Sequence, residues 1–181
     1  MIIKSVQVRN FRCIRDETLE CEDLTVLVGP NGCGKSSFLR AIELFYALPA
    51  RVTEEDFYNK ETGQPIVIRV TFDHLTTQEL GLYKDYVDSN TLTVEKRITS
   101  PGGRGNEKYF GSKMQNPDFQ EVRATDPARV KQQAYGVLRQ QYSELPSIRR
   151  AEDIETALVE WEHGHPESCH RIPDSGQVFG F

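Results

Sequence analysis

The first half of the chain has a hydrophobic pattern that predicts strands around one amphipathic helix. Residues 2–9 mostly alternate between apolar and polar side chains, as a half-buried strand does, and a shorter strand is expected at residues 18–21. Residues 24–28 read Leu-Thr-Val-Leu-Val, a nearly continuous apolar run that indicates a strand buried on both faces. After a glycine-rich break, helical spacing predicts a helix over residues 35–47, ended by Pro49. Its sheet-facing side is expected to consist of Phe38, Ala41, Ile42, Phe45 and Leu48.

The second half changes from a strand pattern to a helical one. Strands are expected at residues 65–72 and 91–99, with a short helical piece at 77–86 and a β-hairpin over 94–110 that turns at 101–106. A helix is predicted over residues 126–145, with Asp126 as its N-cap and Pro127 in its first turn. Its apolar stripe would consist of Val130, Ala134, Val137, Leu138 and Tyr142. A second helix is expected at residues 151–163, and residues 164–181 are predicted to be a loop-like tail.

Composition fits an ordinary globular chain. It has 181 residues, 38% of them hydrophobic, and a net charge of -5, which favours one domain. No stretch approaches the roughly 18 apolar residues of a membrane helix, and the charged N-terminus does not resemble a signal peptide. We therefore expect a cytoplasmic protein with no membrane partner. The cysteines are predicted to be reduced thiols, because they form no Cys-x-x-Cys pair and one lies in the glycine-rich segment: Cys13, Cys21, Cys33 and Cys169.

The charges are segregated along the chain. Residues 1–95 carry 10 basic and 15 acidic groups, residues 96–150 carry 11 and 5, and residues 151–181 carry 1 and 7. The basic middle segment is either an ordinary solvated surface or a surface for phosphate-rich partners. Tyr109 and Phe110 in this segment are either strand aromatics or stacking partners for nucleic acid bases. The acidic overall balance argues against tight DNA binding by this chain alone.

The strongest chemical signal is the sequence Gly-Pro-Asn-Gly-Cys-Gly-Lys-Ser-Ser at residues 29–37, which fits the P-loop pattern G-x-x-x-x-G-K-[ST]. A buried strand is predicted before it and an amphipathic helix after it, as this motif requires. Its glycines let backbone N–H groups and the helix N-terminus hold the phosphates of a nucleotide. Lys35 is expected to neutralise the β- and γ-phosphates, and the Ser36 hydroxyl is expected to bind Mg²⁺.

The chain resembles a known group of ATPases in two segments. Residues 3–12, Ile-Lys-Ser-Val-Gln-Val-Arg-Asn-Phe-Arg, followed by the loop at 28–37, are similar to the N-terminal end of RecF/SMC-type ABC ATPases. Within that group, residues 65–80 and the closing Gly-Gln-Val-Phe-Gly-Phe at 176–181 are similar to the OLD family of ATP-dependent nucleases. The resemblance implies an α/β P-loop fold of ABC-ATPase type, with a mixed sheet around the P-loop helix and an antiparallel N-terminal portion.

The resemblance also implies roles for individual residues. The ATP-binding residues would be Asn31, Gly32, Cys33, Gly34, Lys35, Ser36 and Ser37. Arg12 would contact phosphate or support the adenine pocket; its alternative is an ordinary surface arginine. Gln177 would sense Mg²⁺ and the attacking water, against the alternative of a solvated glutamine. In the complete protein, ATP binding would be coupled to hydrolysis, to dimerisation and to DNA, as in repair or phage-defence nucleases.

Several parts of the family pattern do not occur in this sequence. There is no apolar strand ending in Asp-Glu, no Leu-Ser-Gly-Gly-type signature and no TOPRIM acidic cluster. The nearest substitutes, Asp73 and Glu160, follow alternating or helical patterns instead of an apolar strand. We therefore interpret residues 1–181 as one incomplete ABC-type ATPase domain, with a nucleotide-binding core at 1–125 and a helical portion and tail at 126–181. Alone, it is expected to hydrolyse ATP very slowly.

Two other functions and one other site remain open from the sequence. A small P-loop kinase would use Asp73 for Mg²⁺ and residues 104–150 as a lid, whereas a non-catalytic module would use ATP only to gate binding. Trp161 is expected to anchor a helix. Beside it, four potential metal ligands lie within eight residues, a spacing that fits a solvated loop better than a zinc site: His163, His165, Cys169 and His170.

Overall fold

The computed structural model describes residues 1–102 and 106–174 and divides them into two compact units. The first unit is Met1–Ser112, and the second is Lys113–Ser175. The division falls at residue 112, whereas the sequence pattern placed it at residue 125. Each unit has its own hydrophobic core.

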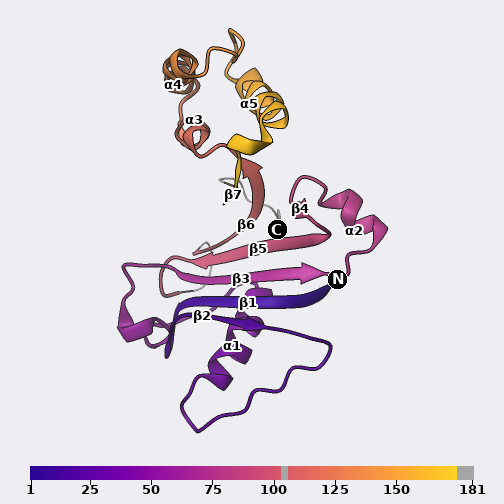
Figure 1. Ribbon diagram of the computed structural model, residues 1–181. Helices are drawn as coiled ribbons and strands as arrows, with labels where there is room; N and C mark the ends of the chain where they lie inside the picture. The colour runs from indigo at the N-terminus through magenta and orange to yellow at the C-terminus, as the bar shows by residue number, and fades with distance from the viewer. Residues whose placement is uncertain (103–105, 175–181) are drawn as a thin grey trace. The chain divides into compact units, whose positions relative to one another are not determined.

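The first unit is built on an antiparallel β-sheet (Figure 1). Each strand pair within it whose register is defined runs antiparallel, so the expected antiparallel N-terminal portion is present. The hairpin predicted over residues 94–110 is confirmed, because Val94 pairs with Gly111 and Ile98 with Glu107. In spatial order the strands are β2 (Ile14–Glu20), β1 (Ile2–Phe11), β3 (Ile66–Asp73), β5 (Thr91–Ile98) and β6 (Glu107–Gln115), and β4 (Val87–Asp88) also pairs with β5.

Helix α1 (Lys35–Tyr46) packs on one face of this sheet, as the sequence predicts. Alternate residues of each strand face the helix, because successive side chains of a strand point to opposite faces. Of the five residues expected to face the sheet, Ala41 and Phe45 are buried, but Leu48 is 46% exposed. The core also takes Leu44 from α1 and the strand residues Val6, Val8, Ile66, Ile68, Val70, Phe72, Leu92, Val94 and Ile98.

Short elements connect the strands. Two 3₁₀ turns, η1 (Glu54–Asp56) and η2 (Tyr58–Lys60), lie between α1 and β3. Helix α2 (Thr77–Leu82) starts with a capping box, in which the Thr76 hydroxyl accepts from the Glu79 N–H and the Glu79 carboxylate accepts from the Thr76 N–H. The predicted helical piece at 77–86 is therefore confirmed, but it is shorter.

The prediction of a buried strand at residues 24–28 is wrong. No strand is assigned to this segment, and three of its side chains lie in solvent: Leu24 is 81% exposed, Val26 70% and Val28 88%. A strand buried on both faces needs a neighbouring strand on each side and a layer above and below it. Among the described residues, no ladder partner is present for this segment, so its apolar side chains stay exposed.

The second unit is mainly helical. It contains η3 (Pro117–Phe119), α3 (Gln120–Ala124), α4 (Ala128–Gln141), α5 (Glu152–Gly164), η4 (Pro166–Ser168) and the short strand β7 (His170–Pro173), which pairs with β6. Its core is an aromatic cluster in which the rings of Phe119, Tyr142 and Trp161 meet edge to face, with each pair of centroids 5.1 Å apart. Trp161 is therefore the helix anchor that the sequence predicts.

The details of this unit correct several predictions. Helix α4 has Pro127 as its N-cap instead of Asp126, because the Val130 N–H donates to the Pro127 carbonyl. In the predicted stripe of α4, Val137 is 67% exposed, whereas Tyr135, outside the stripe, is buried. Helix α5 was predicted over residues 151–163 and is confirmed. The tail beyond it was expected to be loop-like, but η4 and β7 form there.

Candidate nucleotide-binding site

The segment that precedes α1 has a backbone that glycine adopts easily. Gly32 has φ 84° and Gly34 has φ 100°, both in the left-handed region. Gly34 is also the N-cap of α1, so the first N–H groups of the helix follow it directly and have no partners within the helix. Such N–H groups, together with the positive end of the helix dipole, attract phosphate. The last glycine of the predicted P-loop is therefore the N-cap of the predicted helix, and the loop leads directly into α1.

Lys35 folds back over this loop. Its Nζ donates hydrogen bonds to the carbonyl oxygens of Gly29 and Pro30, both at 2.7 Å, and lies 3.7 Å from the Cys33 Sγ. These neutral acceptors hold the ammonium group inside the loop. A nucleotide phosphate would offer it a charged acceptor, and charge-assisted hydrogen bonds are roughly twice as strong as neutral ones.

The serines that follow lie in two different surroundings. Ser36 is exposed in the first turn of α1, which fits a hydroxyl that supplies one ligand to Mg²⁺ while phosphate oxygens and water supply the others. Ser37 is buried, and its Oγ lies 3.4 Å from the Cys13 Sγ. Asn31 and Cys33 are exposed on the loop. Ser37 therefore supports the loop from beneath, and Ser36 is the hydroxyl available to a metal.

The turn between β1 and β2 packs against the start of α1, a contact that the sequence analysis missed. A Cβ atom placed on Gly34 would lie 3.4 Å from the Cys13 Sγ and 3.8 Å from Ile14. Cys13 directly follows the Asn-Phe-Arg element at residues 10–12. The likeness of that element to the family was the sequence feature that could have pointed to this contact. The two distances from the added Cβ are ordinary van der Waals contacts, so the reason for glycine at position 34 is its backbone angle.

Arg12 is paired with another loop instead. Its Nε lies 2.9 Å from the Asp56 Oδ1, and its backbone N–H donates to the Asp56 carbonyl at 2.8 Å. Burial acts to raise the pKa of Asp56, but hydrogen bonds from Thr53 and Arg12 outweigh it and the pKa is lowered. Asp56 is therefore ionised at neutral pH and holds the guanidinium in place. A phosphate contact by Arg12 stays a prediction.

Within the described ranges, no contact links the other candidate residues of the sequence analysis to the loop at residues 29–37. Asp73 lies 2.8 Å from the Nδ1 of its neighbour His74, and Glu160 belongs to α5 in the second unit. Arg104, Gln177 and the segment 176–181 that resembles the OLD family lie outside the described residues.

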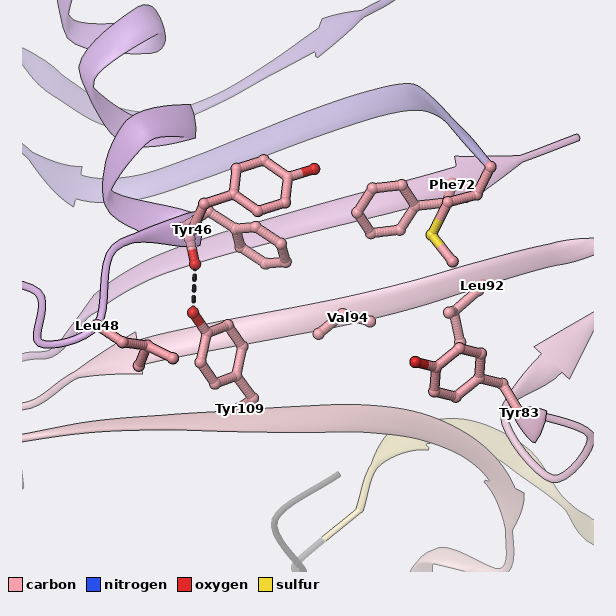
Figure 2. A pocket seen from close by; sticks show the side chains of 9 residues that line it. Tyr46, Leu48, Phe72, Tyr83, Leu92, Val94 and Tyr109 are labelled. Carbon is pink, nitrogen blue, oxygen red and sulfur yellow. Dashed lines mark hydrogen bonds between the residues drawn. The ribbon is translucent and has the colours of Figure 1, made fainter. Parts of the chain in front are cut away.

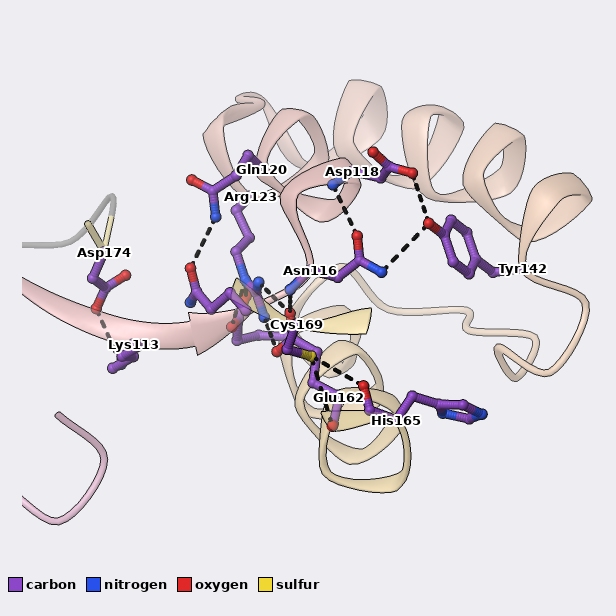
Figure 3. A network of polar contacts seen from close by, with 12 residues as sticks. Lys113, Asn116, Asp118, Gln120, Arg123, Tyr142, Glu162, His165, Cys169 and Asp174 are labelled. Atoms are coloured by element: carbon purple, nitrogen blue, oxygen red, sulfur yellow. Dashed lines mark hydrogen bonds and ion pairs between the residues drawn. The ribbon is translucent and has the colours of Figure 1, made fainter. Parts of the chain in front are cut away.

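The histidine and cysteine cluster is part of a polar network in the second unit (Figure 3). The Cys169 thiol donates to the carbonyl oxygens of Glu162 and His165. The His165 ring stacks on Trp161 at 4.1 Å, and its Nε2 lies 2.9 Å from Glu144. Within residues 1–102 and 106–174, no group of three or more His, Cys, Asp or Glu side chains is placed to hold a metal ion, and His163 and His170 are exposed.

A separate apolar pocket of about 210 Å³ lies near the other end of α1 (Figure 2). Aromatic rings line it, among them Phe45, Tyr46, Phe72, Tyr83 and Tyr109. The 12 residues of α1 span about 18 Å, so this pocket is well separated from the phosphate loop. The hydroxyl of Tyr109 donates to the Phe45 carbonyl at its wall, as Figure 2 shows.

Comparison with known proteins found partial likenesses to two of them. The chain is 43% identical over 82 residues to the OLD nuclease of Thermus scotoductus (strain ATCC 700910 / SA-01), an alignment that covers 42% of this chain and 16% of that protein. A solved SMC ATPase, described by its ATP-driven dimerization and DNA-stimulated activation, covers 60% of this chain and 68% of its own, with 17% identity and a TM-score of 0.41. No helix in the described ranges has the length and apolar character needed to cross a bilayer.

The match that establishes the family covers most of the chain. A family model described as the AAA ATPase domain matches residues 1–156, which include the loop, α1 and the whole first unit. The expected resemblance to the OLD family and the expected ATPase fold are both confirmed. The chain belongs to the AAA ATPase domain family.

Proposed function

We propose that this chain binds ATP and Mg²⁺ through the loop at residues 29–37 and forms the phosphate-binding part of a cytoplasmic ATPase. The observation that carries the proposal is the position of Lys35, inside a glycine loop that directly begins α1. Asn31, Gly32, Cys33 and Gly34 would surround the phosphates, and Ser36 would hold Mg²⁺. When bound, Mg²⁺ would neutralise charge on the phosphate oxygens.

The carboxylate that orients the attacking water would come from another polypeptide segment. The exposed side chains of Leu24, Val26 and Val28 support this step, because they sit on the segment that leads into the loop. Burying each of them against an added strand would contribute roughly 1.5–3 kcal/mol. When such a segment binds, it would bury this apolar surface and at the same time place its carboxylate beside the loop.

In the complete protein, we propose that ATP binding is coupled to dimerisation and to DNA processing. The support is the likeness to a protein named OLD nuclease, of which this chain matches 16%. The chain would then act in DNA repair or phage defence as the nucleotide-dependent part of a larger assembly.

Calorimetric titration with ATP and Mg²⁺ tests the nucleotide site. We expect the wild-type protein to bind and the Lys35→Ala variant to lose binding, because the ammonium group is the main positive charge within the loop. Lys84→Ala removes an exposed lysine of the same unit and is the matched control, which should bind like wild type. Binding that survives Lys35→Ala would overturn the proposal.

Phosphate release in the same samples tests whether the site is complete. We expect negligible turnover from the wild-type chain, since the water-orienting carboxylate contributes a large part of the catalytic effect. Rapid turnover that Lys35→Ala abolishes would show that a carboxylate of this chain, with Asp73 the first to test, completes the site without a second segment.

A further inference from the structure

The face of the first unit's sheet opposite α1, here called the outer face, carries a row of arginines. Lys96 of β5 points toward α1, so its neighbours Glu95 and Arg97 lie on the outer face. The strand register places Arg69 of β3 opposite Glu95 and Lys108 of β6 opposite Arg97. Arg9 of β1 lies on the same face, opposite Val67 of β3.

The three arginines share one carboxylate. Glu95 is 3% exposed, and both its oxygens face guanidinium groups: Arg69 Nη2 at 2.6 Å, Arg9 Nη2 at 3.8 Å, and Arg97. Burial acts to raise the pKa of Glu95, but the arginine hydrogen bonds outweigh it and lower the pKa, so the carboxylate is ionised at neutral pH. Against Glu95, and against Asp16, which lies opposite Arg9 on β2, the three positive charges leave a surplus of one.

This surplus faces solvent. The side chains of Arg9, Arg69 and Arg97 keep 36–39% of their surface exposed, although each contacts the buried carboxylate. Lys108 is exposed beside them and adds a further positive charge. The Nε of Arg9 is buried and has no hydrogen-bond partner among the described residues, so this guanidinium is the least engaged of the three.

The chemistry of the patch fits a polyanion with closely spaced phosphates. A guanidinium presents a planar set of donors that matches phosphate oxygens. The Arg97 Cζ lies over the Phe110 ring, 4.5 Å from its centroid, which positions this guanidinium. Adjacent strands lie about 4.8 Å apart, so the backbone positions of the four basic residues span roughly 15 Å. The three guanidinium groups converge on Glu95, and this cluster together with Lys108 could meet neighbouring phosphates of a nucleic acid strand. Further along the same face lie the polar residues Ser5, Thr71 and Thr93, and the apolar Val67 beside Arg9 is buried, so this face offers few apolar side chains to a lipid bilayer.

We propose that the outer face binds the phosphate backbone of a nucleic acid duplex, through Arg9, Arg69, Arg97 and Lys108, without reading base sequence. This inference rests on the proposed coupling of the ATPase to DNA and assigns that contact to a surface. The acidic residues Asp16 and Glu20 of β2 lie on the same face by register and border the patch at the sheet edge. They confine the duplex to the β1–β6 side of the sheet.

Fluorescence anisotropy with a labelled duplex of about 20 base pairs tests the surface, at salt concentrations from about 50 mM to about 200 mM. The test variant is Arg9→Gln/Arg97→Gln, which leaves Arg69 to pair with Glu95. The control, Arg51→Gln/Lys84→Gln, removes two exposed charges elsewhere in the same unit. We expect at least a tenfold loss of affinity at the lower salt and a log–log salt slope reduced by about 2 in the test variant. The control should behave like wild type.

Lys108→Gln provides a test that does not disturb the buried carboxylate. It should reduce the slope by about 1. Equal affinity and slope for wild type and all three variants would overturn the proposal. The proposal would also be overturned if the protein bound polyglutamate or anionic vesicles at least as tightly as the duplex. The surface would then recognise carboxylates or lipid headgroups and not specifically a nucleic acid.

Measuring both ATP binding and duplex binding in each variant distinguishes a failure of the nucleotide site from a failure of the outer face. Lys35→Ala should lose ATP binding and keep duplex binding, whereas Arg9→Gln/Arg97→Gln should lose duplex binding and keep ATP binding. A Lys35→Ala variant that still binds ATP would contradict the proposed function alone. Unchanged duplex binding by the arginine variant would contradict the surface alone.

Discussion

Replacing Lys96 by methionine should remove a rise in stability that the wild-type protein shows between about pH 7 and about pH 10. Lys96 is 0% exposed, and its Nζ lies under the C-terminal end of α1. It donates to the carbonyl oxygens of Leu44 at 2.9 Å and Ala47 at 2.6 Å, and it lies 3.0 Å from the Tyr109 hydroxyl. The ammonium group therefore satisfies carbonyls that the end of the helix leaves without partners.

The direction of the effect follows from the pKa. Burial lowers the pKa of Lys96 from 10.5 to about 8, and the charge of Glu107 opposes that shift only in part. The unfolded chain thus holds the proton more tightly than the folded protein. Between the two pKa values the unfolded state binds more protons, so the free energy of unfolding rises with pH in this window.

The size of the effect follows from the same values. A separation from about 8 to 10.5 corresponds to about 3 kcal/mol in full, of which about 2–3 kcal/mol is gained between about pH 7 and pH 10. At a single pH, Lys96→Met also leaves the two α1 carbonyls without a donor, which costs roughly 1–3 kcal/mol each, and removes a buried charge. The pH dependence isolates the ionisation from these terms.

Urea unfolding followed by far-UV circular dichroism measures the difference, with Lys84→Met as the exposed-lysine control. Groups present in both proteins, such as Tyr46, cancel when the two curves are subtracted. Fluorescence of Trp161, the single tryptophan, reports on the second unit in the same samples. If wild type and Lys96→Met show parallel stability curves across this pH range, the pKa of Lys96 is the same in the folded and unfolded states and the reasoning fails.

Two further predictions concern the polar network and the loop. Glu162→Gln should lower the stability of the second unit by about 1.5–3 kcal/mol, read by thermal melting with Trp161 fluorescence. The Arg123 side chain is 3% exposed, loses the charged partner at 2.8 Å (Figure 3) and keeps only the half-exposed Glu155 at 3.0 Å. Glu160→Gln, an exposed change on the same helix, should have little effect. Gly34→Ala should abolish ATP binding in calorimetry, because φ 100° is a backbone conformation that residues with a Cβ rarely adopt. Gly63→Ala has open space around it and should bind normally. A melting curve of Glu162→Gln that matches wild type, or intact ATP binding by Gly34→Ala, would contradict these accounts.

Local patterns of residues were enough to locate several strands and the loop. The alternation at residues 2–9, 65–72 and 91–99 correctly located β1, β3 and β5, because a half-buried strand needs that period. The spacing from Gly29 to Ser36 identified the loop and the start of α1, because the loop conformation needs glycine at fixed offsets from the helix.

Features that depend on contacts between segments distant in the chain could not be predicted from local patterns. Residues 24–28 have the pattern of a buried strand but lie in solvent, because burial requires flanking strands that the described part of the chain does not provide. Arg12 pairs with Asp56, 44 residues away, and Cys13 lies beneath Ser37; neither contact leaves a local pattern.

Lys96 shows the same limit most clearly. Its place in the alternation of β5 puts it on the apolar face, where a lysine is rarely found fully buried. It is stable there because α1, an element about fifty residues earlier in the chain, ends directly above it and presents carbonyl oxygens. Local periodicity fixes the face on which a side chain lies, whereas the partner that makes its burial favourable comes from packing between distant segments.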